Sequence, residues 1–267
     1  MSKVIGAMQS NAVEAYWWNT KPNFGDQFTP ELLKSYGLTP VHSKVNDSKV
    51  ISTGSLLHLT NSDYSNHILG SGLIDDRKID LSKAKVWGVR GELTKERVKG
   101  AESAILGDPG LLAKRLLNNK NTNKRYKLGI VPHFVDTNNS SLLKFIAENN
   151  KQVKVINVQK DIRDVIAEIN SCEHIISSSL HGIIVSDALG VPNAWMKLSD
   201  KVIGDGFKFK DYGTSINHNI APVTFNENST LASIIDTMTL REIDQSVFEG
   251  LDEMFIKFSD HIMKNHK

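Results

Sequence analysis

Short apolar runs alternate with longer amphipathic segments along most of the chain, most clearly between residues 127 and 198. The short runs are rich in Val and Ile and have the length of buried strands. The longer segments carry apolar residues at helical spacing, as Leu142, Leu143 and Ile146 do. Strands that alternate with helices of this size indicate βαβ units and a parallel sheet. Here the pattern predicts strands at 127–132, 153–158, 174–177 and 194–197 and helices at 140–149, 161–169 and 180–189.

The first half of the chain repeats this alternation less regularly. A polar, Asn-rich stretch at 118–125 has the composition of a linker between the halves. We therefore expect an α/β protein with a Rossmann-like domain at 1–117 and a second one at 126–225 that faces it across a cleft. A helical tail at 226–267 is expected to pack on the first domain. In the first half, strands are predicted at 49–53, 65–69, 85–89 and 104–106 and helices at 30–36, 91–98 and 109–117.

Composition narrows the class of protein. In 267 residues, 32 Lys and Arg oppose 30 Asp and Glu, a net charge of +2 that excludes a globally basic nucleic-acid-binding protein and an acidic disordered chain. Cys172 is the one cysteine, so neither an intrachain disulfide nor a zinc site built from cysteines can form. No apolar run has the length of a membrane span, and the first residues lack the apolar stretch of a secretory signal. We therefore expect a cytoplasmic protein.

The strongest candidate for chemistry is the segment 177–182, between a predicted strand and a predicted helix. Backbone N–H groups at a helix N-terminus bind anions, and the hydroxyls of Ser178 and Ser179 add donors. His181 can exchange protons near neutral pH, and Gly182 lets a ligand approach the backbone closely. The alternative is a serine-rich helix cap whose histidine forms a local hydrogen bond.

Two turns in the first half are weaker candidates for a binding site. Asn23, Gly25 and Asp26 precede the first predicted helix, where the alternative is an ordinary loop-to-helix turn. Gly54 and Ser55 form a Gly-Ser turn after a predicted strand. Because ligands of α/β sheets bind at the carboxyl ends of strands, both turns are expected near the cleft.

Three cationic side chains are candidates for binding an anion. Arg90 lies between a predicted strand and a predicted helix, where its guanidinium could bind a carboxylate or phosphate or pair with a nearby glutamate at the surface. Lys208 and Lys210 alternate with phenylalanines, which would place both lysines on one face as a phosphate clamp or along a solvated edge.

Asp108 precedes a proline, and we interpret it as a structural helix cap.

Several well-known site motifs are missing from the sequence. It contains no Walker A motif, no Gly-x-Gly-x-x-Gly fingerprint and no Gly-x-Ser-x-Gly nucleophile elbow. It also lacks His-x-x-x-His and His-Glu-x-x-His pairs, so we expect no metal site.

Taken together, these segments resemble the polysaccharide pyruvyl transferase family. The resemblance implies two Rossmann-like domains of the glycosyltransferase-B-like kind, the first on the acceptor side and the second on the donor side. It also implies transfer of a pyruvyl group from phosphoenolpyruvate to a sugar of a surface polysaccharide or its precursor, giving a pyruvate ketal. The matching pieces follow the family's order over most of residues 20 to 215, and they are 23–26, 53–55, 87–91 with Thr94, 106–110, 177–192 and 208–212.

The resemblance also implies roles for the candidate residues. His181 and Asp26 would carry proton transfers. Some family members have an arginine immediately before Leu-His-Gly, where this chain has Ser179, so Arg90, Lys208 or Lys210 would have to supply that cation. No metal and no cofactor are expected, phosphoenolpyruvate being a substrate. The residues expected to bind substrate are Arg90, Ser178, Ser179, Gly182, Lys208, Lys210, Asn23, Gly25, Gly54 and Ser55.

Two other functions remain open at this point. A glycosyltransferase of similar fold would use a nucleotide-sugar and needs a carboxylate for the ribose, for which Asp187 and Asp205 are the candidates. A non-catalytic relative would bind a phosphorylated metabolite or a glycan. The expected partners are phosphoenolpyruvate and a sugar or oligosaccharide acceptor, with no nucleic acid. A lipid-linked acceptor would place the protein near the inner face of a membrane. The sequence does not predict the oligomeric state.

Overall fold

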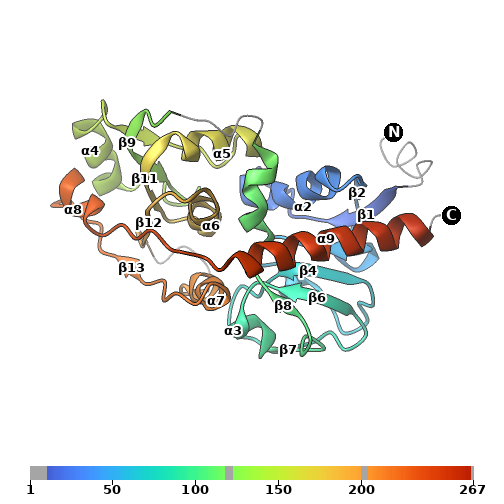
Figure 1. Cartoon of the computed structure of the whole chain (residues 1–267). Coiled ribbons are helices and arrows are strands. Elements are labelled where there is room, and N and C mark those ends of the chain that lie inside the picture. Colours follow the sequence, from blue (N-terminus) through green and yellow to red (C-terminus); the bar gives the residue numbers. More distant parts are fainter. Residues whose placement is uncertain (1–10, 118–122, 200–203, 266–267) are drawn as a thin grey trace.

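The computed structural model describes residues 11–117, 123–199 and 204–265. Its first half contains a six-stranded parallel sheet in the order β2-β1-β3-β4-β6-β8 (Figure 1). A separate parallel pair joins β5 (Ile79–Asp80) and β7 (Val98–Lys99). Helix α2 (Phe24–Ser35) connects β1 to β2, and α3 (Glu92–Lys95) follows β6. The strands of the larger sheet are β1 (Ala12–Tyr16), β2 (Thr39–His42), β3 (Val50–Ile51), β4 (His67–Ser71), β6 (Lys85–Val89) and β8 (Ile105–Leu106).

The second half contains a five-stranded parallel sheet in the order β10-β9-β11-β12-β13. Helices separate its first four strands, as the apolar pattern predicts, and the mixed α/β class is confirmed. The strands are β9 (Tyr126–Val131), β10 (Val153–Val155), β11 (Cys172–Ser177), β12 (Asn193–Met196) and β13 (Pro222–Val223). The helices are α4 (Ser140–Glu148), α5 (Ile162–Asn170), α6 (Leu180–Leu189) and α7 (Phe207–Ser215).

Each sheet has a point where the strand order reverses. In the first sheet β1 lies between β2 and β3, and in the second β9 lies between β10 and β11. Ligands of open α/β sheets bind outside the carboxyl ends of the strands at such a point, because the chain leaves the two neighbouring strands in opposite directions there. The loops after β1, β3, β9 and β11 are therefore the places to look for a site.

The two halves share one apolar core. Helix α6 packs on the 3₁₀ helix η3 (Pro109–Leu116), and α2 packs on α5. One continuous cluster of buried side chains includes Phe28, Leu112, Ile166 and Ile184, which come from α2, η3, α5 and α6. The loops of the two halves are consequently held against each other by side-chain packing.

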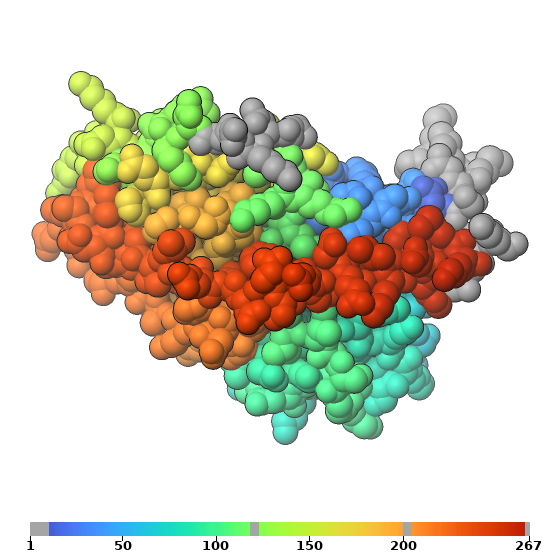
Figure 2. All heavy atoms as spheres, in the orientation of Figure 1, coloured from blue at the N-terminus to red at the C-terminus, as the bar shows by residue number. Residues whose placement is uncertain are grey.

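The C-terminal segment packs on both halves. Helix α8 (Leu231–Ile235) buries Ile234 in the core of the second half, and Thr239 forms an antiparallel bridge with Asn193. The chain then returns as the long helix α9 (Gln245–Asn265), which lies against β4, β6, β8 and η3 (Figures 1 and 2). The apolar pattern predicts packing on the first half only, and α8 departs from it. None of the helices within the described ranges is long and apolar enough to cross a lipid bilayer.

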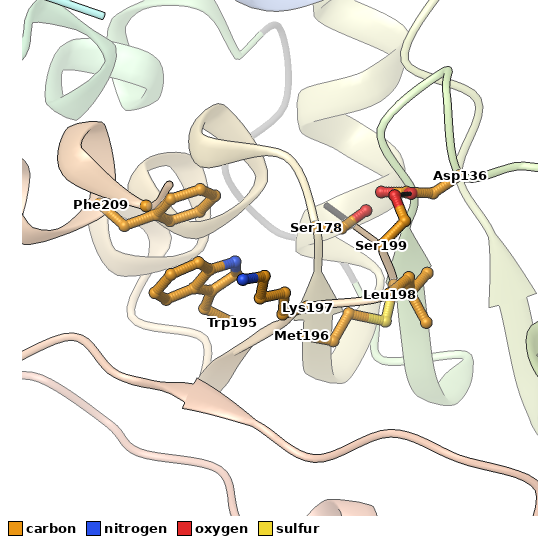
Figure 3. Close-up of a pocket in the computed structure, with 9 residues that line it drawn as sticks. Asp136, Ser178, Trp195, Met196, Lys197, Leu198, Ser199 and Phe209 are labelled. Atoms are coloured by element: carbon orange, nitrogen blue, oxygen red, sulfur yellow. Dashed lines mark hydrogen bonds between the residues drawn. The ribbon is translucent and has the colours of Figure 1, made fainter. Parts of the chain in front are cut away.

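Several elements differ from the sequence-based expectation. The apolar pattern missed β1 and β2, and the segment from 109 to 116 is a 3₁₀ helix. The lysine- and phenylalanine-rich segment forms α7, and a helix does not place its two lysines on one face as the alternation suggested. The Phe209 ring of α7 stacks on Trp195 of β12 (Figure 3), with ring centroids 4.2 Å apart and planes at 8°. This contact packs α7 against β12.

Candidate active site

A pocket of about 460 Å³ lies where the loops of the two halves meet. From the first half, residues of the β1–α2 loop and of the turn after β3 line it, and from the second half, residues that follow β9 and β11 and one side chain of α7. Seven of the residues expected to form the site line this pocket: Asn23, Asp26, Gly54, Ser55, Ser179, His181 and Lys208.

The β1–α2 turn presents Asp26 to the pocket. Asn23 is the N-cap of α2, and its side-chain oxygen accepts a hydrogen bond of 3.2 Å from the Gly25 backbone N–H. A Cβ at Gly25 would overlap the His181 ring, so only glycine allows this turn to lie against the imidazole. Burial raises the pKa of the Asp26 carboxyl to about 7, against the opposing attraction of Lys208. Asp26 can therefore hold or release a proton near neutral pH.

His181 lies one residue into α6 with its ring packed against the first half. It stacks on Phe28 at a centroid distance of 5.9 Å and meets the Phe24 ring edge-on at 6.2 Å. Its Nε2 is buried without a hydrogen-bond partner in the described part of the chain, 3.8 Å from an Asp108 carboxylate oxygen. Burial, and then the charges of Arg90 and Lys208, lower the pKa of the imidazole to about 3. His181 is therefore neutral near pH 7, and it acts as a base only where a negative charge, such as that of Asp108 or of a bound anion, stabilises the imidazolium.

Asp108 is a residue whose place in the site the sequence did not reveal. Its Oδ1 accepts a 2.8 Å hydrogen bond from the Gly110 N–H, as expected of a helix cap. Its Oδ2 is buried and has no partner among the described residues, and burial raises the pKa of the carboxyl to about 6. Asp108 thus lies behind His181, on the Nε2 side. The position of Asp108 within a family-like segment was the available signal, but helix capping explained it equally well.

Lys208 and Lys210 do not form a common face, and the expected lysine clamp is wrong. Residues two apart on an α-helix point about 200° apart. Lys208 therefore enters the pocket, where burial and the Arg90 charge lower the pKa of its ammonium to about 8, while Asp26 opposes the shift. Lys210 is exposed and lines a separate surface hollow with Leu93.

Arg90 is fully buried, so the expectation that it binds a substrate directly has to be corrected. Its Nε donates to Asp211 at 2.8 Å, one terminal nitrogen donates to the Ser55 hydroxyl at 2.7 Å, and the other donates to the Leu73 carbonyl at 2.5 Å. Ser55 accepts from Arg90 and also lines the pocket. Its own O–H remains free to donate, polarised by the guanidinium behind it. The positive φ of Gly54, +111°, makes this turn possible.

In the serine-rich segment, one residue lines the pocket, and others make contacts that support the start of α6. Ser179 lines the pocket, whereas the Ser178 hydroxyl accepts a 2.9 Å hydrogen bond from the His133 N–H and lines a small cavity of about 20 Å³ beside Asp136 (Figure 3). Gly182 packs against the Ser177 side chain, where a Cβ would overlap the hydroxyl. Of the expected ligand-binding residues here, Ser178 and Gly182 therefore support the helix and do not line the pocket.

The rim of the pocket contains side chains that the sequence analysis did not propose. Trp18 is 41% exposed, and the ammonium of Lys21 lies 5.3 Å from the centre of the Phe134 ring. Burial and the Lys208 charge lower the pKa of His133 to about 4. No strict motif marks these residues, because each is an ordinary loop residue until the two halves meet. Within the described ranges, no three His, Cys, Asp or Glu side chains gather closely enough to hold a metal ion.

The polysaccharide pyruvyl transferase family model matches residues 14–200. The chain is 34% identical over 152 residues to the uncharacterised protein L143 of Acanthamoeba polyphaga mimivirus, covering 54% of this chain and 53% of that protein. It is 27% identical over 212 residues to the succinoglycan biosynthesis protein ExoV of Rhizobium meliloti, covering 78% of this chain and 66% of ExoV. The chain thus spans about half to two thirds of the length of these curated relatives.

A likeness to solved structures is weak. UDP-GlcNAc 2-epimerase from Methanocaldococcus jannaschii shares 9% identity at a TM-score of 0.49, with 95% of this chain and 99% of that chain covered. A functionally uncharacterised protein from Klebsiella pneumoniae shares 14% identity at a TM-score of 0.42, covering 81% of this chain and 91% of that chain. Neither carries a conclusion about function. Because the family model matches most of its length, the chain belongs to the polysaccharide pyruvyl transferase family.

Proposed function

We propose that this protein transfers a pyruvyl group from phosphoenolpyruvate to a sugar of a polysaccharide or of its precursor, forming a pyruvate ketal. The observation that carries the proposal is one pocket that combines a half-buried lysine, two hydroxyls and two titratable side chains. Those residues are Lys208, Ser55, Ser179, Asp26 and His181. The family supports the proposal, as does the similarity to the succinoglycan biosynthesis protein ExoV of Rhizobium meliloti.

The pocket suits a small, multiply charged anion. The Lys208 ammonium supplies the cation that an arginine at position 179 would supply in other members, and it comes from α7, whereas residue 179 comes from the turn before α6. The Ser55 O–H, polarised by Arg90, and the N-terminus of α6 add donors without adding bulk. A carboxylate and a phosphate of one ligand can therefore be bound together.

The proposed reaction needs an acid and a base. Asp26, with its pKa near 7, protonates the methylene carbon of phosphoenolpyruvate, which becomes the methyl group and leaves the adjacent carbon with oxocarbenium character. A sugar hydroxyl attacks that carbon and gives its proton to neutral His181. Phosphate leaves with the electrons of its C–O bond and takes the proton from His181. A second hydroxyl of the sugar then closes the ketal and returns its proton to the Asp26 carboxylate. Asp108 stabilises the imidazolium formed at His181 from 3.8 Å.

Neither carboxylate that could bind the ribose of a nucleotide-sugar lines the pocket. Asp187 is buried and accepts hydrogen bonds from Asn193, Arg241 and the Tyr212 hydroxyl, at 2.6, 3.0 and 2.9 Å. Asp205 has a side chain that is 94% exposed and does not line the pocket. Neither carboxylate is in a position to bind a ribose there.

Ligand binding and turnover test the proposal separately. A ligand that binds the folded chain raises its melting temperature, so we expect phosphoenolpyruvate to raise it and UDP- and GDP-sugars to leave it unchanged. With an acceptor, His181→Ala should lower phosphate release by about 10²–10⁴-fold while the shift caused by phosphoenolpyruvate persists. A shift with nucleotide-sugars alone would refute the donor, and near-full phosphate release by His181→Ala would refute the role of the histidine.

A further inference from the structure

A second groove adjoins the pocket on the side of the second sheet. It has a volume of about 540 Å³ and lies at the carboxyl ends of β9 and β10. Lys21 and Phe134 line both the pocket and this groove, so the two hollows meet at one shared wall. The surface hollows around Lys99 and Lys210 share no lining residue with the pocket. Both volumes fall within the range of about 300–1,000 Å³ that small-ligand sites occupy.

The lining of the groove suits a neutral, hydroxyl-rich ligand. The amide side chain of Gln159 belongs to an exposed loop and has no hydrogen-bond partner within the described residues. Asn157 adds the NH₂ donor of a second amide, whose oxygen accepts a 3.0 Å hydrogen bond from the Gln159 backbone N–H. Val155 is 39% exposed, and with Phe134 it offers an apolar surface for the C–H face of a sugar ring. Lys21 is the one charged residue among those that line the groove in the described ranges. The single positive charge of one ammonium does not neutralise the two or more negative charges of a pyrophosphate, so a neutral ligand fits the groove better.

We propose that this groove is a subsite for the sugar residues that adjoin the reacting sugar of the acceptor. The inference rests on the proposed function: the rest of such an acceptor must leave the pocket, and the wall of Lys21 and Phe134 leads into the groove. The reacting sugar occupies the pocket beside Asp26 and His181, and the next sugars pack on Phe134 and Val155. Gln159 and Asn157 exchange hydrogen bonds with their hydroxyls.

Two variants of the groove and one matched control test this subsite. Val155→Trp fills the groove from the end of a strand, where a large β-forming residue is tolerated. Gln159→Ala removes an amide that supports no fold contact in the described residues. Leu143→Trp is the control, because Leu143 is 50% exposed on α4 and does not line the groove. The probes are methyl glycosides of neutral hexoses with one to four residues, and their binding is followed by saturation-transfer NMR.

We expect the wild-type protein and Leu143→Trp to bind a trisaccharide about tenfold more tightly than the methyl hexoside. In Val155→Trp and Gln159→Ala this gain from chain length should disappear, while the melting shift caused by phosphoenolpyruvate is unchanged. Equal gains in all four proteins, or no binding of any oligosaccharide in the series, would overturn the subsite. Glycan binding in the groove without any effect of phosphoenolpyruvate would support the subsite and refute the proposed donor, so the two failures are distinguishable.

Discussion

Two neighbouring side chains beside the pocket each contain an unsatisfied polar atom. In the described chain, His181 Nε2 and Asp108 Oδ2 are both buried without a hydrogen-bond partner. Leaving such atoms unpaired costs free energy, about 1–3 kcal/mol each, and folded proteins seldom do so away from functional sites. The cost is consistent with a site whose groups are held ready for proton transfer.

Asp26→Asn should stabilise the protein and abolish most of its activity. The raised pKa means that the folded chain holds the Asp26 proton more tightly than the unfolded chain does. The stabilisation is therefore complete below about pH 4 and is lost as the pH rises through about 7. At pH 8 the buried charge destabilises the wild type, and asparagine removes it.

We expect Asp26→Asn to melt at a higher temperature than the wild type at pH 8 and at a similar temperature at pH 4. Phosphate release should fall by about 10²-fold or more. The exposed carboxylate of Asp260 provides the control, because Asp260→Asn should change neither quantity appreciably. A lower melting temperature for Asp26→Asn at pH 8 would show that the ionised carboxylate is stabilised by its surroundings.

Asp108→Asn separates helix capping from action on His181. Asparagine keeps an oxygen for the Gly110 N–H but loses the charge near the imidazole. By analogy with groups that orient a reacting histidine, we expect phosphate release to fall by about 10–100-fold. The ¹⁵N spectrum of the His181 ring should report a changed tautomer or pKa. Asp161→Asn is the control, since Asp161 caps α5 through the same kind of bond to Arg163. An unchanged His181 spectrum in Asp108→Asn would leave Asp108 as a cap alone.

At the scale of elements, α7 decides which of its two lysines reaches the pocket. Its helical turn directs Lys208 inward and Lys210 to solvent, and the stacking of Phe209 on Trp195 packs the helix in place. The N-terminus of α6 contributes Ser179 and His181 to the same pocket. Two helices from different parts of the second half thus meet at one pocket.

The two lysines of α7 form a matched pair for experiment. Lys208→Met should weaken phosphoenolpyruvate binding at least about tenfold, because the pocket loses the Lys208 ammonium and keeps that of Lys21 at its rim. Lys210→Met should leave the binding unchanged, because Lys210 is outside the pocket. The melting shift as a function of phosphoenolpyruvate concentration measures both. Equal losses in the two variants would mean that net charge, not the pocket, controls binding.

At the scale of the whole molecule, Asp211 connects the two halves below the pocket. Its carboxylate accepts from Arg90 and from both the backbone N–H and the hydroxyl of Thr94, and all three residues are fully buried. A Cβ at Gly91 would overlap the Asp211 carbonyl, so the chain at the start of α3 and α7 approach each other backbone to backbone. Arg90 extends this network to Ser55 and hence to the pocket.

Asp211→Ala should destabilise the protein by about 3–5 kcal/mol, because it leaves the Arg90 charge buried without its partner. Asp63→Ala breaks the exposed Lys83 pair, which solvent screens, and should change the free energy of unfolding little. Denaturant unfolding measures both values. A cost for Asp211→Ala as small as that of Asp63→Ala would show that the network does not stabilise the contact between the halves.

The sequence by itself determined the α/β class, most of the strands and helices, and the turns that carry Asp26, Ser55 and His181. Strand and helix periods, caps and glycine turns are local properties, and a single stretch of chain records them. The cytoplasmic location, the domain boundaries and the phosphoenolpyruvate donor remain predictions.

The tertiary structure decided which candidates meet. Arg90 and Asp211 are 121 residues apart in the chain, yet their pairing removes Arg90 from the pocket surface. Lys208 lines the pocket and Lys210 does not, because the segment is a helix that packs on β12 through Phe209, and residues two apart on a helix point in different directions. Asp108 lies near His181 only because η3 packs on α6. Such choices depend on contacts between distant segments, and a local pattern of residues does not record those contacts.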